Sequence, residues 1–110
     1  MYSAAPSTRS ATPANQRFVS AYKARFPAAG EPNGSGAAAY DAVYMLQEAM
    51  QRVGTDRKAV RDAFAGIGTA TPAFEGAMGT IAFDEHGDVP SLKIYVGQVR
   101  DGVMQPAEGQ

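Results

Sequence analysis

The longest run of regularly spaced apolar residues covers residues 36–53 and predicts an α-helix. These residues recur at intervals of three and four, as they do along one side of a helix: Ala39, Ala42, Val43, Leu46, Ala49, Met50 and Val53, with Ala38 and Met45 widening the side. Polar side chains fall on the opposite side, and Gly54 follows where a helix commonly ends. Because many of the apolar residues are alanines, we expect a broad buried side that packs closely against a flat partner such as a β-sheet.

Two further helices are predicted, one before and one after this segment. The first covers 13–26, behind the candidate N-cap Thr12, and its apolar side consists of Phe18, Val19, Tyr22 and Phe26. Residues 27–35 hold two prolines and two glycines, which is typical of a linker between helices. The other helix covers 56–65, with Thr55 as its expected N-cap and a buried side made of Ala59, Val60, Ala63 and Phe64.

Strands are predicted only after the helices. Residues 1–12 are expected to be an extended lead-in, and 66–79 are too rich in glycine and turn residues for a regular element before Thr80. The remaining pattern predicts a strand at 80–83, a turn at 84–88, a strand at 93–100, and a hairpin turn at Asp101 and Gly102 before a short return strand at 103–104. Two short hairpins cannot cover three apolar helix sides, so we expect the uncovered area to meet something outside the chain.

Composition narrows the possible partners. The 110 residues suffice for one domain, and 10 basic against 11 acidic residues, without a run of like charge, argue against nucleic-acid or anionic-membrane binding. The absence of cysteine excludes disulfides and thiolate metal sites. No apolar run approaches the roughly 20 residues of a membrane span. The first residues lack the layout of a secretory signal, so either the protein stays in the cytoplasm or its targeting segment lies outside this sequence.

Candidate chemistry is sparse. Residues 34–39 match a loose dinucleotide-binding pattern, but no strand precedes them as that site requires, so a plain helix entry is favoured. The acidic cluster around His86, within 84–88, lacks the spacing of calcium or zinc ligands and is interpreted as a solvated turn. No nucleophile can be paired with a base, so we expect no enzyme, no metal and no cofactor. Tyr40 and Tyr44 lie one helical turn apart, and taken alone both are interpreted as packing residues.

Three stretches of the sequence together resemble a known protein family: AAAYDAVYMLQEAMQRVGTDRKAVRDAF, FEGAMGTIAFDEHGDV and IYVGQVRDG. They resemble the C-terminal third of the solute-binding proteins of branched-chain amino-acid ABC importers, the leucine/isoleucine/valine-binding proteins of type I periplasmic-binding-protein fold. The most specific part is the pattern F-x-G-x-x-G-x-I-x-F-D-E-x-G-D, carried by Phe74, Gly76, Gly79, Ile81, Phe83, Asp84, Glu85, Gly87 and Asp88.

The resemblance implies an α/β fold, built here of three helices followed by C-terminal β-hairpins and without the parallel sheet that these helices cover in the family. It also implies a division of the chain. Residues 1–12 would be the extended lead-in, 13–88 the helical part and hairpin of the first lobe, and 89–110 the crossover strand and tail of the second lobe. The chain is therefore interpreted as a fragment of a receptor that is periplasmic or otherwise extracytoplasmic.

Members of the family bind a small solute, such as an amino acid, between their lobes and deliver it to an ABC permease without covalent chemistry. The one ligand-binding position that the resemblance carries over is Tyr40, whereas Tyr44 is expected to lie deeper and to be structural. The isolated chain is expected to bind no solute. The alternative is a self-associating helical interaction module, a homo-oligomer formed through the uncovered apolar sides, with no solute-binding activity of its own.

Overall fold

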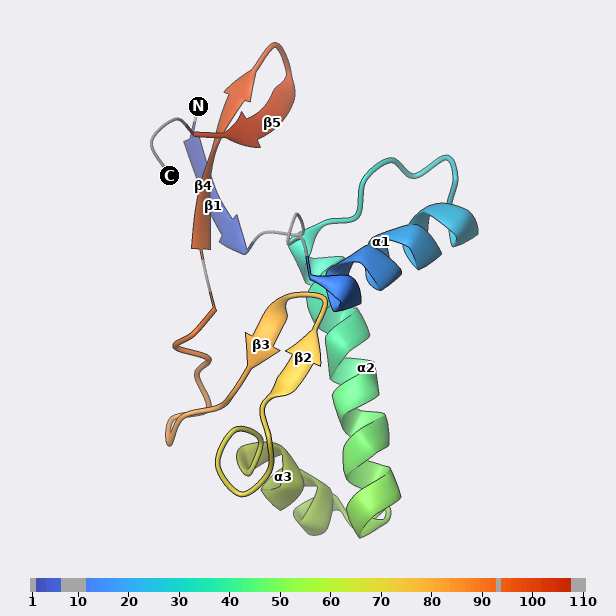
Figure 1. Cartoon of the computed structure of the whole chain (residues 1–110), viewed down its shortest axis with the longest axis vertical. Helices are drawn as coiled ribbons and strands as arrows, with labels where there is room; N and C mark the ends of the chain where they lie inside the picture. Colours follow the sequence, from blue (N-terminus) through green and yellow to red (C-terminus); the bar gives the residue numbers. More distant parts are fainter. Residues whose placement is uncertain (1, 7–11, 93, 108–110) are drawn as a thin grey trace.

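The computed structural model describes residues 2–6, 12–92 and 94–107, and within them the chain forms three helices and five strands (Figure 1). Their bounds are β1 (Tyr2–Pro6), α1 (Pro13–Arg25), α2 (Gly34–Val53), α3 (Arg57–Ala65), β2 (Phe74–Gly76), β3 (Gly79–Ile81), β4 (Ile94–Arg100) and β5 (Val103–Pro106). The long α2 is central in Figure 1: α1 lies near its beginning, α3 near its end, and the β2–β3 hairpin beside it. The sheet of β1, β4 and β5 projects away from the helices at one end of the molecule.

Local sequence signals set the helix limits. The Thr12 hydroxyl accepts from the amide of Asn15 at 3.2 Å, as expected of an N-cap. Gly54 ends α2 with a φ of 79°, a conformation that suits glycine. The predicted cap of α3 was wrong by one residue: the carboxylate of Asp56, not Thr55, accepts from the Ala59 amide at 2.9 Å. An aspartate there also complements the helix dipole.

The side of α2 that packs within the chain is not the side that its apolar residues predicted. The buried residues of α2 are Ala37, Asp41, Met45 and Ala49, which follow one another at intervals of four. Most of the predicted buried side is exposed, including Val43 at 65%, Leu46 at 41%, Met50 at 37% and Val53 at 40%. The reason is the position of the β2–β3 hairpin, whose residues pack against Met45 and Ala37 and leave the more apolar side open.

Two hydrophobic clusters hold the helical part together. The first joins α1, α2 and the β2–β3 loop through Phe18, Ala37 and Ala77. The second joins α2 to the hairpin through Met45, Ile67 and Ile81, with Phe64 of α3 packed against it. No residue of α3 is fully buried, so its predicted buried side is only half covered.

Two strands were not predicted. β2 forms within the stretch that was expected to be irregular and pairs with β3, placing Phe74 opposite Ile81. β1 forms within the expected lead-in and pairs antiparallel with β4, with Tyr2 opposite Gln98. β4 is therefore the central strand, between β1 and β5. β1 depends on a partner strand distant in the sequence, which local patterns do not reveal. β2 pairs with the adjacent β3 across a two-residue loop, within a stretch rich in glycine and turn residues.

The two predicted turns form as expected. Both Asp101 (φ 51°) and Gly102 (φ 75°) have positive φ between β4 and β5, as a two-residue hairpin turn requires. In the 84–88 turn, one oxygen of Asp84 accepts from the amides of His86 and Asp88, each at 2.9 Å. The His86 side chain is exposed, which agrees with a solvated turn.

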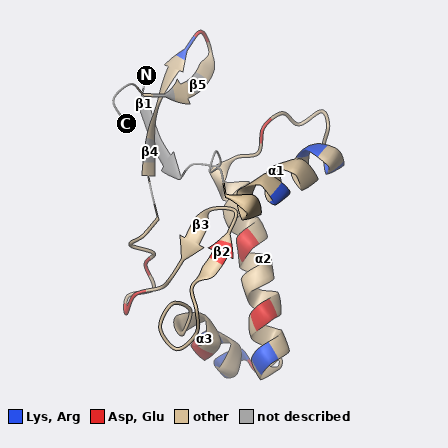
Figure 2. Cartoon of the chain, viewed as in Figure 1, with Lys and Arg blue, Asp and Glu red and all other residues tan. Residues whose placement is uncertain are grey.

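Charged residues are distributed over several elements. Figure 2 shows Lys and Arg on α1, on α3 and at the end of α2, with Asp and Glu on α2 and α3. Among the described helices, none is both long and apolar enough to cross a membrane.

Candidate functional site

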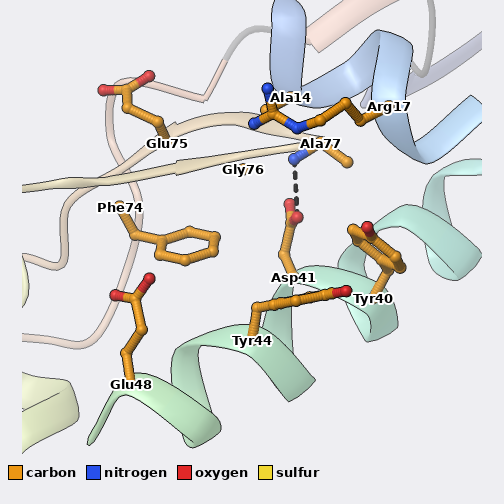
Figure 3. Close-up of a pocket in the computed structure, with 10 residues that line it drawn as sticks. All are labelled: Ala14, Arg17, Tyr40, Asp41, Tyr44, Glu48, Phe74, Glu75, Gly76 and Ala77. Atoms are coloured by element: carbon orange, nitrogen blue, oxygen red, sulfur yellow. Dashed lines mark hydrogen bonds between the residues drawn. The ribbon is translucent and has the colours of Figure 1, made fainter.

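A pocket of about 300 Å³ lies between α1, α2 and β2, and Figure 3 shows the side chains around it. Tyr40, the predicted ligand-binding residue, lines this pocket. The lining residues come from three elements and the loop after β2: Ala14 and Arg17 of α1, Tyr40, Asp41, Tyr44 and Glu48 of α2, and Phe74, Glu75, Gly76 and Ala77.

Asp41 holds the hairpin at the back of this pocket. Its side chain is only 2% exposed, and its two carboxylate oxygens accept from the amides of Ala77 and Met78 at 2.7 and 2.8 Å. Charged acceptors make hydrogen bonds stronger than neutral ones, so this buried carboxylate is well compensated. It fixes the two-residue loop between β2 and β3 to the side of α2.

Gly76 leaves the room that Asp41 needs. A Cβ atom at this position would lie 2.4 Å from a carboxylate oxygen of Asp41, closer than real atoms approach. The glycine and the aspartate are therefore one structural unit, although 35 positions separate them in the sequence, 76 − 41.

Asn15 ties α1 to the same loop. It is 3% exposed, and its side-chain amide donates to the carbonyl of Ala77 at 2.9 Å. Two buried polar side chains from different helices thus bind the loop at 77–78, which we call the hairpin tip. Sequence analysis missed both residues. Both could have been suspected from the sequence, because each is a polar residue within one helical turn of the apolar side of its helix.

Tyr40 and Tyr44 form one wall of the pocket. Their ring centroids lie 4.8 Å apart, and the Tyr40 ring also lies 5.0 Å from that of Phe18. A hydrogen bond with Tyr44, together with burial, raises the pKa of the Tyr40 hydroxyl. The expectation that Tyr44 lies deeper was wrong: Tyr44 is 45% exposed, whereas Tyr40 is half-buried, because α1 covers Tyr40 through Phe18.

Three charged side chains surround the pocket entrance. Glu75 accepts from the Thr80 hydroxyl at 3.0 and 3.1 Å. Arg17 and Glu48 are exposed, and neither forms a hydrogen bond or ion pair with another residue in the part of the chain that the structure describes. Figure 3 shows the Arg17 side chain near Ala77 and the Glu48 carboxylate on the other side of the Phe74 ring. Two opposite charges are therefore available to a ligand.

The other candidate motifs do not form a site. Residues 34–39 are the first turns of α2, and the Asn33 side chain caps them by accepting from the Gly36 amide at 2.8 Å. Across residues 2–6, 12–92 and 94–107, no group of three His, Asp or Glu side chains is arranged to hold a metal ion.

The sequence matches a family model described as periplasmic binding protein over residues 1–103. The chain belongs to the periplasmic binding protein family. This agrees with the resemblance found in the sequence and with the α/β arrangement of three helices and short strands. A comparison with curated proteins finds no match.

Solved structures of such binding proteins resemble the chain closely. A leucine-binding protein, LivK, from Thermotoga maritima MSB8 shares 27% identity with a TM-score of 0.81, over 97% of this chain and 29% of its own. An ABC transporter substrate-binding protein from Desulfitobacterium hafniense shares 25% identity with a TM-score of 0.77, over 96% and 30%. A substrate-binding protein of the same organism in complex with Leu has a TM-score of 0.76 at 22% identity, over 96% and 30%, which shows the fold alone.

The chain thus spans 29–30% of the length of these solved proteins. The matched family consists of solute-binding proteins and not of enzymes, which agrees with the absence of a paired nucleophile and base from the sequence.

Proposed function

We propose that the chain is part of an extracytoplasmic receptor that delivers a branched-chain amino acid or a similar small solute to an ABC importer. The observation that carries the proposal is the family match over residues 1–103 in a chain spanning 29% of LivK. The exposed apolar side of α2 supports it, because a receptor three times longer has the polypeptide needed to cover that side.

The proposed division places residues 13–88 in the first lobe and 89–110 in the second. It is supported by the two hydrophobic clusters, which join α1, α2, α3 and the β2–β3 hairpin, and by the separate sheet that contains β4 (Figure 1). The pairing of β1 with β4 supports assigning the part of the lead-in at Tyr2–Pro6 to the second unit.

The proposal predicts that the isolated chain does not trap a solute, because the trap needs both complete lobes. Calorimetric titration with leucine and valine should give no micromolar or tighter binding. Micromolar binding of either amino acid by the 110-residue chain would contradict the proposal.

Within a complete receptor, we propose that Tyr40 contacts the solute. Its half-buried ring near the beginning of α2 supports this role. The test is a chimera in which this chain replaces the matching 29% of LivK. Tyr40→Ala should weaken leucine binding by about tenfold, the size of one lost side-chain contact in a buried pocket. Tyr44→Ala, at an exposed position, should weaken leucine binding less than Tyr40→Ala does. Equal losses of affinity in the two variants would contradict a ligand contact by Tyr40.

A second candidate function is self-association through α2. The exposed side carries Val43, Leu46, Met50 and Val53 and no charged residue, so two copies could face each other without repulsion. Light scattering coupled to size exclusion tests this candidate. A dimer that dissociates in Leu46→Glu would support it, whereas a monomer at low micromolar concentration would contradict it.

A further inference from the structure

We propose that Asn15 is a positioning residue for Tyr40, acting through the hairpin tip to set the orientation of the Tyr40 ring. The effect on the ring can be measured in this chain alone. Its consequence for solute binding rests on the receptor role proposed above, in which Tyr40 contacts the solute.

Asn15 is buried at a position where an apolar side chain would be expected. It lies one helical turn before Phe18 on α1, and both side chains are buried. Asparagine is a poorer helix former than alanine or leucine, and burying its amide costs free energy unless the amide is hydrogen-bonded. The bond to the Ala77 carbonyl, at 2.9 Å, offsets that cost. Because a hydrogen bond has a preferred length and angle, it fixes α1 relative to the tip more narrowly than an apolar contact would.

The hairpin tip connects Asn15 to Tyr40 by direct contacts. Ala77 is buried in the first hydrophobic cluster with Phe18, and Tyr40 packs against that cluster. The ring centroids of Phe18 and Tyr40 lie 5.0 Å apart, with the ring planes tilted by 53°. On α2, Asp41 directly follows Tyr40, and its carboxylate accepts from the Ala77 amide. Asn15 therefore bonds the same residue of the tip as the immediate neighbour of Tyr40 does.

The buried support of the Tyr40 ring comes from α1. The second ring neighbour is Tyr44, with 4.8 Å between the centroids, and Tyr44 is exposed. An exposed side chain keeps more rotamer freedom than a buried one, so Phe18 is the neighbour that fixes the Tyr40 ring. A shift of α1 that carries Phe18 away from the tip would therefore change how the ring faces the pocket.

These contacts lie where the helical part adjoins the sheet. Figure 1 shows the beginnings of α1 and α2 and the loop between β2 and β3 together, at the end of the helical part from which the sheet projects. Under the proposed division this end faces the second lobe. A binding group keeps its productive geometry only when the residues behind it are held by packing and hydrogen bonds. Asn15 is not among the residues that line the pocket, so its effect on a solute has to pass through the tip.

The first test uses the 110-residue chain and the NMR signals of the Tyr40 ring. Asn15→Asp keeps the shape of the side chain but removes its N–H donor, so the Tyr40 ring signals should shift as the Phe18 ring moves. Asn33→Asp is the matched control, because the Asn33 oxygen caps α2 by accepting from the Gly36 amide and a carboxylate keeps that acceptor. Asn15→Ala, which adds no charge, replaces the aspartate variant if that variant does not fold. Unchanged Tyr40 signals in a folded Asn15 variant, or equal shifts in the control, would overturn the proposal.

The second test separates positioning from stability in the LivK chimera described above. Asn15→Asp should weaken leucine binding about threefold or more, because the Tyr40 ring no longer meets the solute in its productive orientation. In a chimera that already carries Tyr40→Ala, the same substitution should leave the leucine affinity unchanged. Additive losses in the double variant would show a purely structural role for Asn15 and overturn the proposal.

The two proposals fail in different ways. If Tyr40→Ala alone leaves the leucine affinity unchanged, the solute contact by Tyr40 is contradicted, and shifted ring signals in Asn15→Asp still support the action of Asn15 on the ring. If Tyr40→Ala weakens binding about tenfold but the ring signals do not change in Asn15→Asp, the action of Asn15 is contradicted and the solute contact is not.

Discussion

At the scale of single residues, the hairpin tip is where the chain depends most on side-chain chemistry. Asp41 accepts two backbone hydrogen bonds and Asn15 donates a third; the bonds with Ala77 are buried and the one from Met78 is partly buried. A buried polar group without a partner costs more than a hydrogen bond contributes, so these contacts are mutually dependent. Removing either side chain should therefore lower the stability of the whole helical part.

Asp41→Ala should lower the free energy of unfolding by about 3 kcal/mol, because it leaves one buried and one partly buried amide group without an acceptor. Asp41→Asn should cost less, about 2 kcal/mol, since the amide keeps one acceptor oxygen. Urea unfolding monitored by circular dichroism measures both. Asp88→Asn, at an exposed position, is the control and should not change the midpoint. Equal stability of Asp41→Ala and the parent chain would show that the hydrogen bonds between Asp41 and the hairpin tip do not stabilise the fold.

Gly76→Ala should be destabilising by about 2 kcal/mol for a steric reason, because the added Cβ would displace the Asp41 carboxylate. Gly36→Ala is the matched control. Its Cβ would meet only the Asn33 oxygen at 3.4 Å, and alanine favours helices over glycine. If both variants unfold at the same urea concentration, the close approach at Gly76 is not a constraint.

Tyr40 should ionise above the ordinary tyrosine pKa of about 10, chiefly because its hydroxyl is hydrogen-bonded to Tyr44. A raised pKa in the folded state means that the neutral hydroxyl stabilises the fold. This contribution is complete below the unfolded pKa and is lost as the pH rises through the folded pKa. Ultraviolet titration of phenolate should show a late component that Tyr40→Phe removes and Tyr44→Phe shifts to lower pH. A late component unaffected by Tyr44→Phe would exclude the hydrogen bond as its cause.

At the scale of elements, α2 has two apolar sides with different roles. One side, with Met45 and Ala49, packs against the hairpin and the segment after α3. The other, with Leu46 and Met50, is exposed in this chain. A helix that is apolar over so much of its surface is typical of one packed between two layers, and the chain itself supplies one of them.

Neighbouring substitutions in α2 should therefore differ sharply. Met45→Ala should cost about 2 to 3 kcal/mol, because it opens a cavity in the second hydrophobic cluster. Leu46→Ala should cost less than about 0.5 kcal/mol in the monomer, as expected of an exposed position in a helix. Urea unfolding at low protein concentration compares them. A large loss in Leu46→Ala would indicate that this side is covered in solution, by a second copy.

At the scale of the whole molecule, the chain consists of a helical part and a small sheet that extends from it (Figure 1). β1 and β4 come from opposite ends of the sequence, and their pairing closes the chain on itself. Among the residues whose side chains the structure describes, those of β4 and β5 do not belong to the two hydrophobic clusters. The two parts should therefore respond separately to perturbation.

Val96→Pro should remove protection from amide exchange in the sheet while leaving α2 protected. Proline in the central strand cannot donate to the ladder and disrupts its pairing with β1. Hydrogen exchange followed residue by residue gives the measurement, with Val103→Thr at an exposed position of the edge strand as the control. Loss of protection in α2 as well would mean that the sheet and the helices fold as one unit.

The sequence by itself determined the features that depend on neighbouring residues. The structure confirms the predicted helices, the N-cap at Thr12, the end of α2 at Gly54 and the turn at Asp101. Each is decided by side chains within a few positions, so a local pattern contains the information. The family resemblance was also readable from the sequence, and the family match over residues 1–103 confirms it.

Only the tertiary structure decided which residues meet across the chain. Asp41 bonds amides that lie 36 and 37 positions away, and β1 finds its partner strand near the other end of the sequence. Arg17 and Glu48 line the same pocket for the same reason, because that pocket is formed by α1, α2 and β2. Periodicity shows that a helix side is apolar, but the position of the packing partner determines which side is buried, and that partner is chosen by long-range contacts.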